Sequence, residues 1–125
     1  MDAKGTILLI EDEPDIRAVY SEVLMGAGYN VLEASDGKAG LDLALQEHWD
    51  ICILDIMIPV LDGVHVLKIV KTNEKTKNKP VLLLTNVDNE NLITEAFEYG
   101  AAGYLIKAEI TPENILNEVT SYLNK

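Results

Sequence analysis

The chain has 125 residues, 48% of them hydrophobic, and its 21 acidic and 10 basic residues give a formal net charge of −11. This length and composition predict one globular domain, residues 1–125, with a core of its own. The charge argues against direct contact with nucleic acid or anionic membranes, because both require clustered positive charge. No apolar stretch reaches the roughly 18 residues of a membrane span, and residues 1–6 do not resemble a signal peptide. We therefore expect a soluble, cytoplasmic protein.

Cysteine and histidine are too sparse for redox or zinc chemistry. Cys52 is the single cysteine, so an intramolecular disulfide is excluded, and its apolar neighbours predict a buried, inert thiol. His48 and His65 lie far apart in the sequence, which argues against a zinc cluster.

Five short apolar runs predict strands. The runs around residues 8, 53 and 83 are apolar at almost every position, which is typical of parallel strands covered on both faces. The second run contains Glu33 and the fifth is short, so we expect these two at the edges of the sheet. The five runs are residues 6–10, 31–34, 51–54, 81–84 and 103–106.

Stretches with the apolar spacing of amphipathic helices follow each run, at residues 16–24, 37–47, 63–72, 92–97 and 115–123. Asp62, Asp88 and Thr111 stand where N-caps are expected. Gly28 and Gly100 stand where helices are expected to end. Five strand–helix units predict a doubly wound α/β domain with a five-stranded parallel sheet. The flavodoxin-like strand order 2-1-3-4-5 places the two least apolar strands at the edges, and the functional crevice then opens at the carboxyl ends of the strands.

Polar residues follow the predicted strands at that crevice. Glu11 and Asp12 follow the first strand and Asp55 follows the third, while Thr85 and Lys107 end the fourth and fifth. Three carboxylates close together repel one another, and a hard divalent cation such as Mg²⁺ would relieve the repulsion. A solvated loop is the alternative interpretation of the acidic run at residues 11–13.

The same residues carry a family resemblance. Residues 7–14 (ILLIEDEP) resemble the opening of a response regulator receiver domain, the CheY-like module of two-component signal transduction. Residues 54–63 (LDIMIPVLDG) resemble the phosphoacceptor loop of that family closely. Thr85, Tyr104 and Lys107 fall at the spacings of its remaining landmarks, so the resemblance covers essentially the whole chain.

The resemblance implies a role for each matching residue. It implies that Asp55 is the phosphoacceptor, that Thr85 is the switch hydroxyl and that Tyr104 is the switch aromatic residue. Lys107 corresponds to the lysine that contacts the phosphoryl group. A Mg²⁺ ion would be held by Glu11, Asp12, Asp55 and the backbone carbonyl of Met57.

Partners and activity are implied in the same way. The phosphoryl donor would be a phosphohistidine on a sensor histidine kinase or a histidine phosphotransfer protein. A downstream protein, or an output domain outside this sequence, would read the face built from the fourth helix, fifth strand and fifth helix, and that face could also form a dimer. The chain would catalyse only its own phosphorylation and dephosphorylation, and would not otherwise be an enzyme.

Two positions depart from the family pattern. Asn86 follows Thr85 where a small residue is usual, and we expect its side chain either to crowd the phosphoryl entrance or to hydrogen-bond within the site. Ala108 follows Lys107 where proline with a cis bond is usual, and we expect a trans peptide here because a cis bond before alanine costs about 3–4 kcal/mol. These departures leave open a degenerate receiver that binds partners without phosphorylation.

Two other classes of protein fit the sequence less well. An aspartyl-phosphate phosphatase would have a second acid where Met57 stands. A flavin carrier would have a small, hydroxyl-rich phosphate loop after the first strand, where this chain has acidic residues.

Overall fold

The computed structural model describes residues 4–85 and 90–123, and its strands and helices alternate along the chain. The strands are β1 (Thr6–Ile10), β2 (Asn30–Ala34), β3 (Ile51–Asp55), β4 (Val81–Thr85) and β5 (Gly103–Ile106). The helices are α1 (Pro14–Gly26), α2 (Gly37–Gln46), α3 (Gly63–Thr72), α4 (Glu90–Glu98) and α5 (Pro112–Leu123). All strand pairs are parallel and the order is β2-β1-β3-β4-β5. The predicted fold class and strand order are therefore confirmed.

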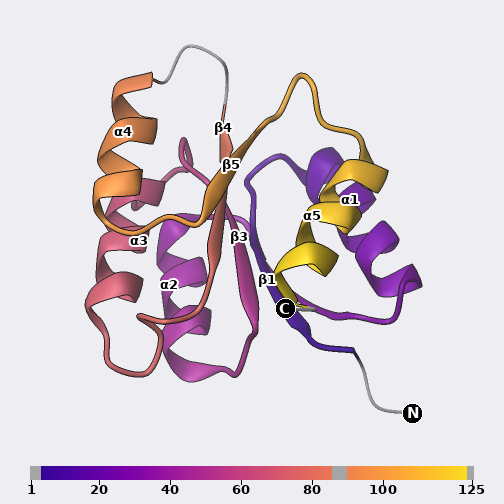
Figure 1. Ribbon diagram of the computed structural model, residues 1–125, viewed down its shortest axis with the longest axis horizontal. Coiled ribbons are helices and arrows are strands. Elements are labelled where there is room, and N and C mark those ends of the chain that lie inside the picture. The colour runs from indigo at the N-terminus through magenta and orange to yellow at the C-terminus, as the bar shows by residue number, and fades with distance from the viewer. Residues whose placement is uncertain (1–3, 86–89, 124–125) are drawn as a thin grey trace.

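Helices cover both faces of this sheet (Figure 1). Helices α1 and α5 lie on one face, and α2, α3 and α4 lie on the other. Because successive side chains of a strand point to opposite faces, β1 supplies both cores: Ile7 and Leu9 pack with α1 and α5, while Leu8 and Ile10 pack with the other three helices. This two-sided burial explains why the central strands are apolar at nearly every position.

Burial differs between the central and the edge strands, as predicted. Every residue of β3 and β4 is buried, whereas β2 and β5 are partly exposed. Cys52 is buried in β3, as expected, and burial raises the pKa of its thiol.

Several helix ends follow the sequence signals. The Asp62 side chain accepts the His65 N–H at 3.0 Å, and the Thr111 hydroxyl accepts the Asn114 N–H at 3.2 Å, so both predicted caps are present. Gly28 and Gly100 have φ values of 103° and 102°, a left-handed conformation that glycine adopts without steric cost. Asp88, the third predicted cap, lies outside the described residues. None of the described helices combines the length and apolarity needed to cross a membrane.

Candidate functional site

Three carboxylates meet at the carboxyl ends of β1 and β3. Ile10 is paired with Leu54 in the sheet, so Glu11 and Asp55 continue adjacent strands from neighbouring positions. One carboxylate oxygen from each of Glu11, Asp12 and Asp55 lies within 4.8 Å of the others. Glu11 is fully buried and Asp55 is 2% exposed. The structure thus brings the predicted acidic residues together, with Glu11 and Asp55 buried and Asp12 partly exposed.

Lys107 reaches this cluster from the far side of β4. Its backbone N–H donates to the Thr85 carbonyl at 2.8 Å, which holds the residue at the end of β5. Its ammonium nitrogen Nζ lies 2.7 Å from Asp55 Oδ2 and 2.7 Å from Glu11 Oε1. Glu13 Oε1, at 3.6 Å, adds a weaker contact. We call Glu11, Asp12, Asp55 and Lys107 the acidic pocket.

Burial and charge shift the protonation of this pocket. Burial, followed by the neighbouring Asp55 carboxylate, raises the pKa of Glu11 to about 8, although Lys107 opposes the shift. Burial alone would lower the pKa of Lys107, but its hydrogen bonds to Asp55 and Glu11 outweigh burial and raise it. The arrangement therefore favours a charged Lys107 and opposes ionisation of Glu11.

The loop after β3 positions the Asp55 carboxylate. The Met57 N–H donates to Asp55 Oδ1 at 3.0 Å, and the Gly63 N–H donates to the Ile56 carbonyl at 2.9 Å, which turns the chain back beneath the site. A Cβ atom at Gly63 would lie 2.6 Å from the Asp55 carbonyl oxygen, so this close approach requires glycine. Val60, in the same loop, has a φ of 72°, which is uncommon for a β-branched residue.

The fourth and fifth strands contribute the remaining predicted residues. Thr85 is 1% exposed at the end of β4, beside the pocket. Tyr104 is 45% exposed on β5, and its ring packs edge-to-face on Phe97 of α4 with the ring centroids 6.1 Å apart. Asn86 lies outside the described residues. The described peptide bonds include no cis bond, so the expected trans peptide before Ala108 is confirmed.

One supporting residue was not anticipated from the sequence. Arg17 Nη1 donates to the backbone carbonyl of Glu11 at 2.7 Å, and its Nε lies 3.5 Å from Glu33 on the edge strand. Arg17 is the single arginine of the chain, in the first turns of α1 after Pro14. Its position close to the acidic run is the signal that could have identified it.

Comparison with known proteins agrees with this geometry. The family model described as "Response regulator receiver domain" matches residues 7–120. The chain is 37% identical over 119 residues to the DNA-binding dual master transcriptional regulator RpaA of Synechocystis sp., covering 95% of this chain and 49% of RpaA. It thus spans about half the length of the curated relatives it matches.

Solved structures share the fold over nearly the whole chain. The chemotaxis response regulator CheY4 of Vibrio cholerae is 31% identical with a TM-score of 0.87, and the match covers 98% of this chain and 99% of CheY4. The receiver domain of sensor histidine kinase PA1611 from Pseudomonas aeruginosa is 24% identical with a TM-score of 0.87, covering 97% and 98% of the two chains. That structure is described with a magnesium ion coordinated in its active site cleft. From the family match and the sheet that places its acidic residues together, we conclude that this chain belongs to the response regulator receiver domain family.

Proposed function

We propose that the chain accepts a phosphoryl group on the Asp55 carboxylate and thereby changes a surface that a partner protein reads. The observation that carries the proposal is the Lys107 ammonium, held 2.7 Å from Asp55 Oδ2 inside a buried acidic pocket. A structural ion pair alone would not account for two further carboxylates converging on the same point.

The reaction is an in-line displacement at phosphorus. One Asp55 oxygen forms the new P–O bond, the P–N bond of a phosphohistidine breaks, and its electron pair leaves on the imidazole, which is then protonated. The Met57 N–H holds the carboxylate in place. The positively charged Lys107 ammonium stabilises the negative charge on the transferring phosphoryl oxygens. Hydrolysis of the resulting acyl phosphate returns the chain to its starting state, so the activity is limited to its own phosphorylation and dephosphorylation.

The acidic pocket fits a Mg²⁺ ion. Hard oxygen ligands come from Glu11, Asp12 and Asp55. The buried Glu11 Oε1 lies 2.7 Å from Lys107 Nζ but makes no hydrogen bond to a described residue, so it can serve as a metal ligand. We propose that these three carboxylates hold the ion, with the Met57 carbonyl as a further ligand. The bound cation supplies positive charge for the transferring phosphoryl group. The magnesium described in the Pseudomonas neighbour agrees with this assignment.

The switch and the partners complete the proposal. The donor is a sensor histidine kinase or histidine phosphotransfer protein, and the reader is a downstream protein or an output domain, in the cytoplasm. A phosphoryl oxygen that draws the Thr85 hydroxyl toward it would open space for Tyr104 to turn inward from its exposed position against Phe97. The face that carries α4, β5 and α5 would then change shape.

Intact mass tests the proposal. Incubated with acetyl phosphate and Mg²⁺, the wild-type chain should gain the mass of one phosphoryl group, and Asp55→Asn should gain none. Asp42→Asn is the matched control, because Asp42 lies on α2 in a surface pair with Lys38 and should not affect the reaction. An equal mass gain in Asp55→Asn would exclude Asp55 as the acceptor. No gain in the correctly folded wild type would favour the degenerate receiver instead.

A further inference from the structure

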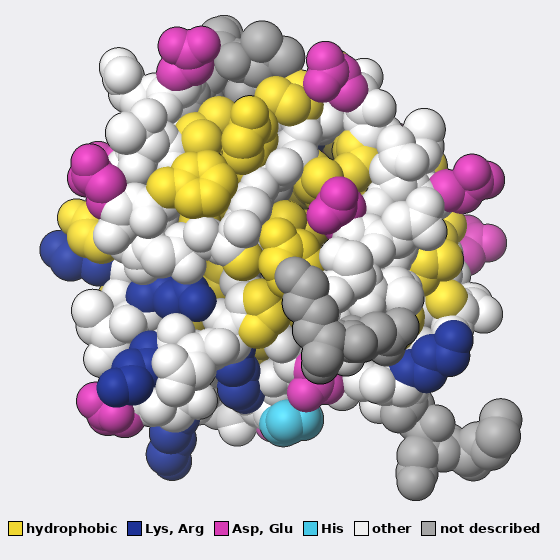
Figure 2. Space-filling model, viewed as in Figure 1, with side chains coloured by type: hydrophobic (Ala, Val, Ile, Leu, Met, Phe, Trp, Pro, Cys, Tyr) yellow, Lys and Arg dark blue, Asp and Glu magenta, His cyan; other side chains and the backbone are white. Residues whose placement is uncertain are grey.

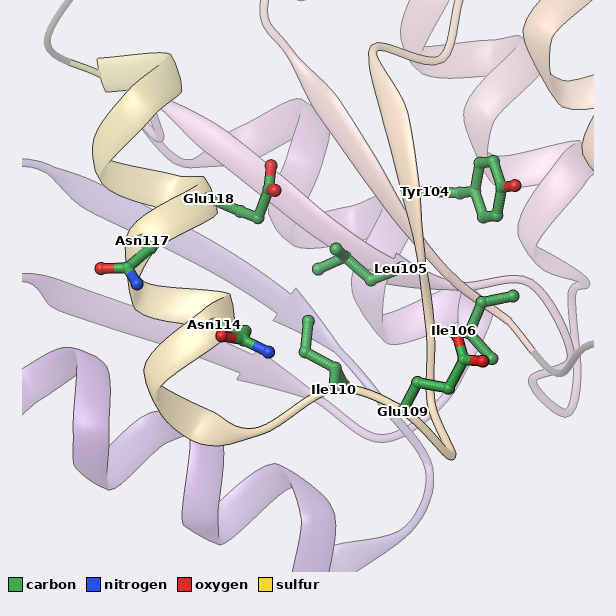
Figure 3. Close-up of a pocket in the computed structure, with 8 residues that line it drawn as sticks. All are labelled: Tyr104, Leu105, Ile106, Glu109, Ile110, Asn114, Asn117 and Glu118. Carbon is green, nitrogen blue, oxygen red and sulfur yellow. The ribbon is translucent and has the colours of Figure 1, made fainter.

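A groove lies between β5 and α5, outside the acidic pocket (Figure 3). Its volume is about 530 Å³. Leu105 and Ile110 provide apolar lining, while Asn114 and Glu118 of α5 face them across the groove. Glu109 lines the end of the groove near the loop after β5. The groove therefore has a mixed lining, in which apolar side chains of β5 and the following loop lie beside polar side chains that include two carboxylates.

Exposed aromatic side chains adjoin this groove. Tyr104 lines the edge of the groove, and its ring packs on Phe97 of α4. The two rings are 45% and 42% exposed. In Figure 2, hydrophobic side chains gather over α4, β5 and α5 with an acidic side chain among them. We call this surface the α4–β5–α5 face, and its aromatic residues are of the kind that dominate binding energy at interfaces.

The charge of this face has one sign. Residues 90–123 contain six glutamates, namely Glu90, Glu95, Glu98, Glu109, Glu113 and Glu118. Lys107 is the single basic residue of residues 90–123, and its ammonium contacts Glu11 and Asp55 in the acidic pocket. Within residues 4–85 and 90–123, no ion pair involves any of the six glutamates. These six carboxylates therefore form no salt bridge within the described residues, and two of them, Glu109 and Glu118, line the groove itself.

This charge disfavours a second copy of the chain as the occupant. A two-fold symmetric dimer places the same patch of each copy against the other. Glutamates would then face glutamates, because the described residues of α4, β5 and α5 include no lysine or arginine, and such like-charge contacts are unfavourable. A partner with positive charge around an apolar segment would satisfy both the groove and its carboxylates.

From the groove, the exposed aromatic pair and the one-signed charge, we infer that the α4–β5–α5 face binds a positively charged amphipathic segment of a different protein. Apolar side chains of that segment fill the groove beside Leu105 and Ile110, and its lysines or arginines lie against Glu109 and Glu118. The inference rests on the proposed function, since Tyr104 would connect this face to phosphorylation. It adds the chemical class of the partner.

A synthetic helical peptide with leucines on one face and lysines on the other is the probe. Titrated into ¹⁵N-labelled chain, it should shift amide signals of residues 104–118, and a peptide with glutamates in place of the lysines should not bind. The double variant Glu109→Lys/Glu118→Lys should weaken binding of the lysine peptide about tenfold, and Glu109→Gln/Glu118→Gln should weaken it less. Raising the salt concentration should weaken binding to the wild type.

The matched control is Glu22→Lys/Glu47→Lys. These exposed glutamates lie outside the groove, and the net charge changes by the same amount. Equal weakening in both lysine double variants, or shifts scattered over the chain, would mean attraction to net charge alone and would overturn the inference. Self-association of the wild type that shifts residues 104–118 without peptide would overturn it in favour of a second copy.

A phosphorylation assay distinguishes the inferred partner binding from the proposed function on which it rests. Intact mass after acetyl phosphate treatment should show the same phosphoryl gain in the wild type and in both double variants. Peptide binding in the groove without any phosphorylation of the wild type would contradict the proposed function alone. Normal phosphorylation without groove binding would contradict the inference alone.

Discussion

The two sides of the carboxyl-end edge of the sheet differ in how firmly they hold their side chains. On the β1–β3 side, Glu11 and Asp55 are buried and fixed by adjacent strands whose residues are almost all inaccessible to solvent. On the β5 side, Tyr104 is 45% exposed on an edge strand, and its ring packs edge-to-face on Phe97. Buried neighbours leave a side chain little freedom, whereas an exposed ring at a sheet edge can change rotamer at small cost.

This difference suits a protein that performs chemistry on one side and signals from the other. Phosphoryl transfer depends on fixed positions, because small displacements of reacting groups are costly. A switch instead needs two arrangements separated by only a few kcal/mol. Lys107 joins the two sides, since its backbone extends β5 while its ammonium lies between Glu11 and Asp55. The following predictions test this division.

Removal of the Lys107 charge should have the largest effect. Lys107→Met keeps most of the side-chain volume but leaves the buried Asp55 carboxylate without its cation. We expect phosphorylation by acetyl phosphate to slow by about 100-fold. We also expect the metal-free protein to lose about 3 kcal/mol of its free energy of unfolding in urea. The control is Lys38→Met, which breaks an exposed pair with Asp42 and should cost at most about 1 kcal/mol. Equal effects of the two variants would refute a special role for Lys107.

Magnesium affinity should rise with pH. The pKa of Glu11 is raised to about 8, so below that pH the carboxyl holds a proton that the cation must displace. Affinity should therefore increase up to about tenfold per pH unit below pH 8 and level off above it, as measured by isothermal titration calorimetry. Glu11→Gln removes the titrating group and should flatten the profile while weakening binding. A flat profile in the wild type would show that Glu11 is already ionised or is not a ligand.

Thr85→Ala should uncouple the two sides while leaving the chemistry in place. The variant keeps Asp55 and Lys107, so we expect it to accept phosphate. It should lose most of the phosphorylation-dependent change in amide chemical shifts over residues 90–106, because no hydroxyl remains to respond to the phosphoryl oxygens. Tyr104→Ala is the companion variant, and it should leave phosphorylation intact and lose the change around α4. A wild-type pattern of shifts in Thr85→Ala would contradict the coupling.

The smallest change in the free energy of unfolding is expected for a substitution in the loop after β3. Val60 has a φ of 72° and is 78% exposed, so it has backbone strain with little burial in return. Val60→Gly should raise the free energy of unfolding by about 0.5–1 kcal/mol. Thermal unfolding of the two proteins would measure the change, and destabilisation by Val60→Gly would mean that the loop gains more from the valine than its exposure indicates.

Much of the fold was predictable because burial on both faces leaves a direct trace in the sequence. Strands with two buried faces must be apolar throughout, and this pattern identifies β1, β3 and β4 in the sequence. The apolar runs by themselves stop short of the strand ends: β3 extends to Asp55 and β4 to Thr85, one polar residue beyond each run, although both residues were predicted to stand at the strand ends. Backbone pairing extends past the last apolar side chain, and periodicity of hydrophobic residues does not register that.

The residues that form the acidic pocket were predictable, but their contacts, burial and pKa values were not. The sequence by itself determined which residues stand at the strand ends, since parallel strands direct all their carboxyl ends to one edge. Tertiary structure decided the rest. It placed Lys107 against Glu11 and Asp55, which lie 96 and 52 residues away in the chain. It also brought the Arg17 guanidinium to the Glu11 carbonyl. Finally, it buried Glu11 deeply enough to raise the pKa of its carboxyl group. Contacts, burial and pKa depend on distances between segments remote in the chain, and those distances exist only once the sheet has formed.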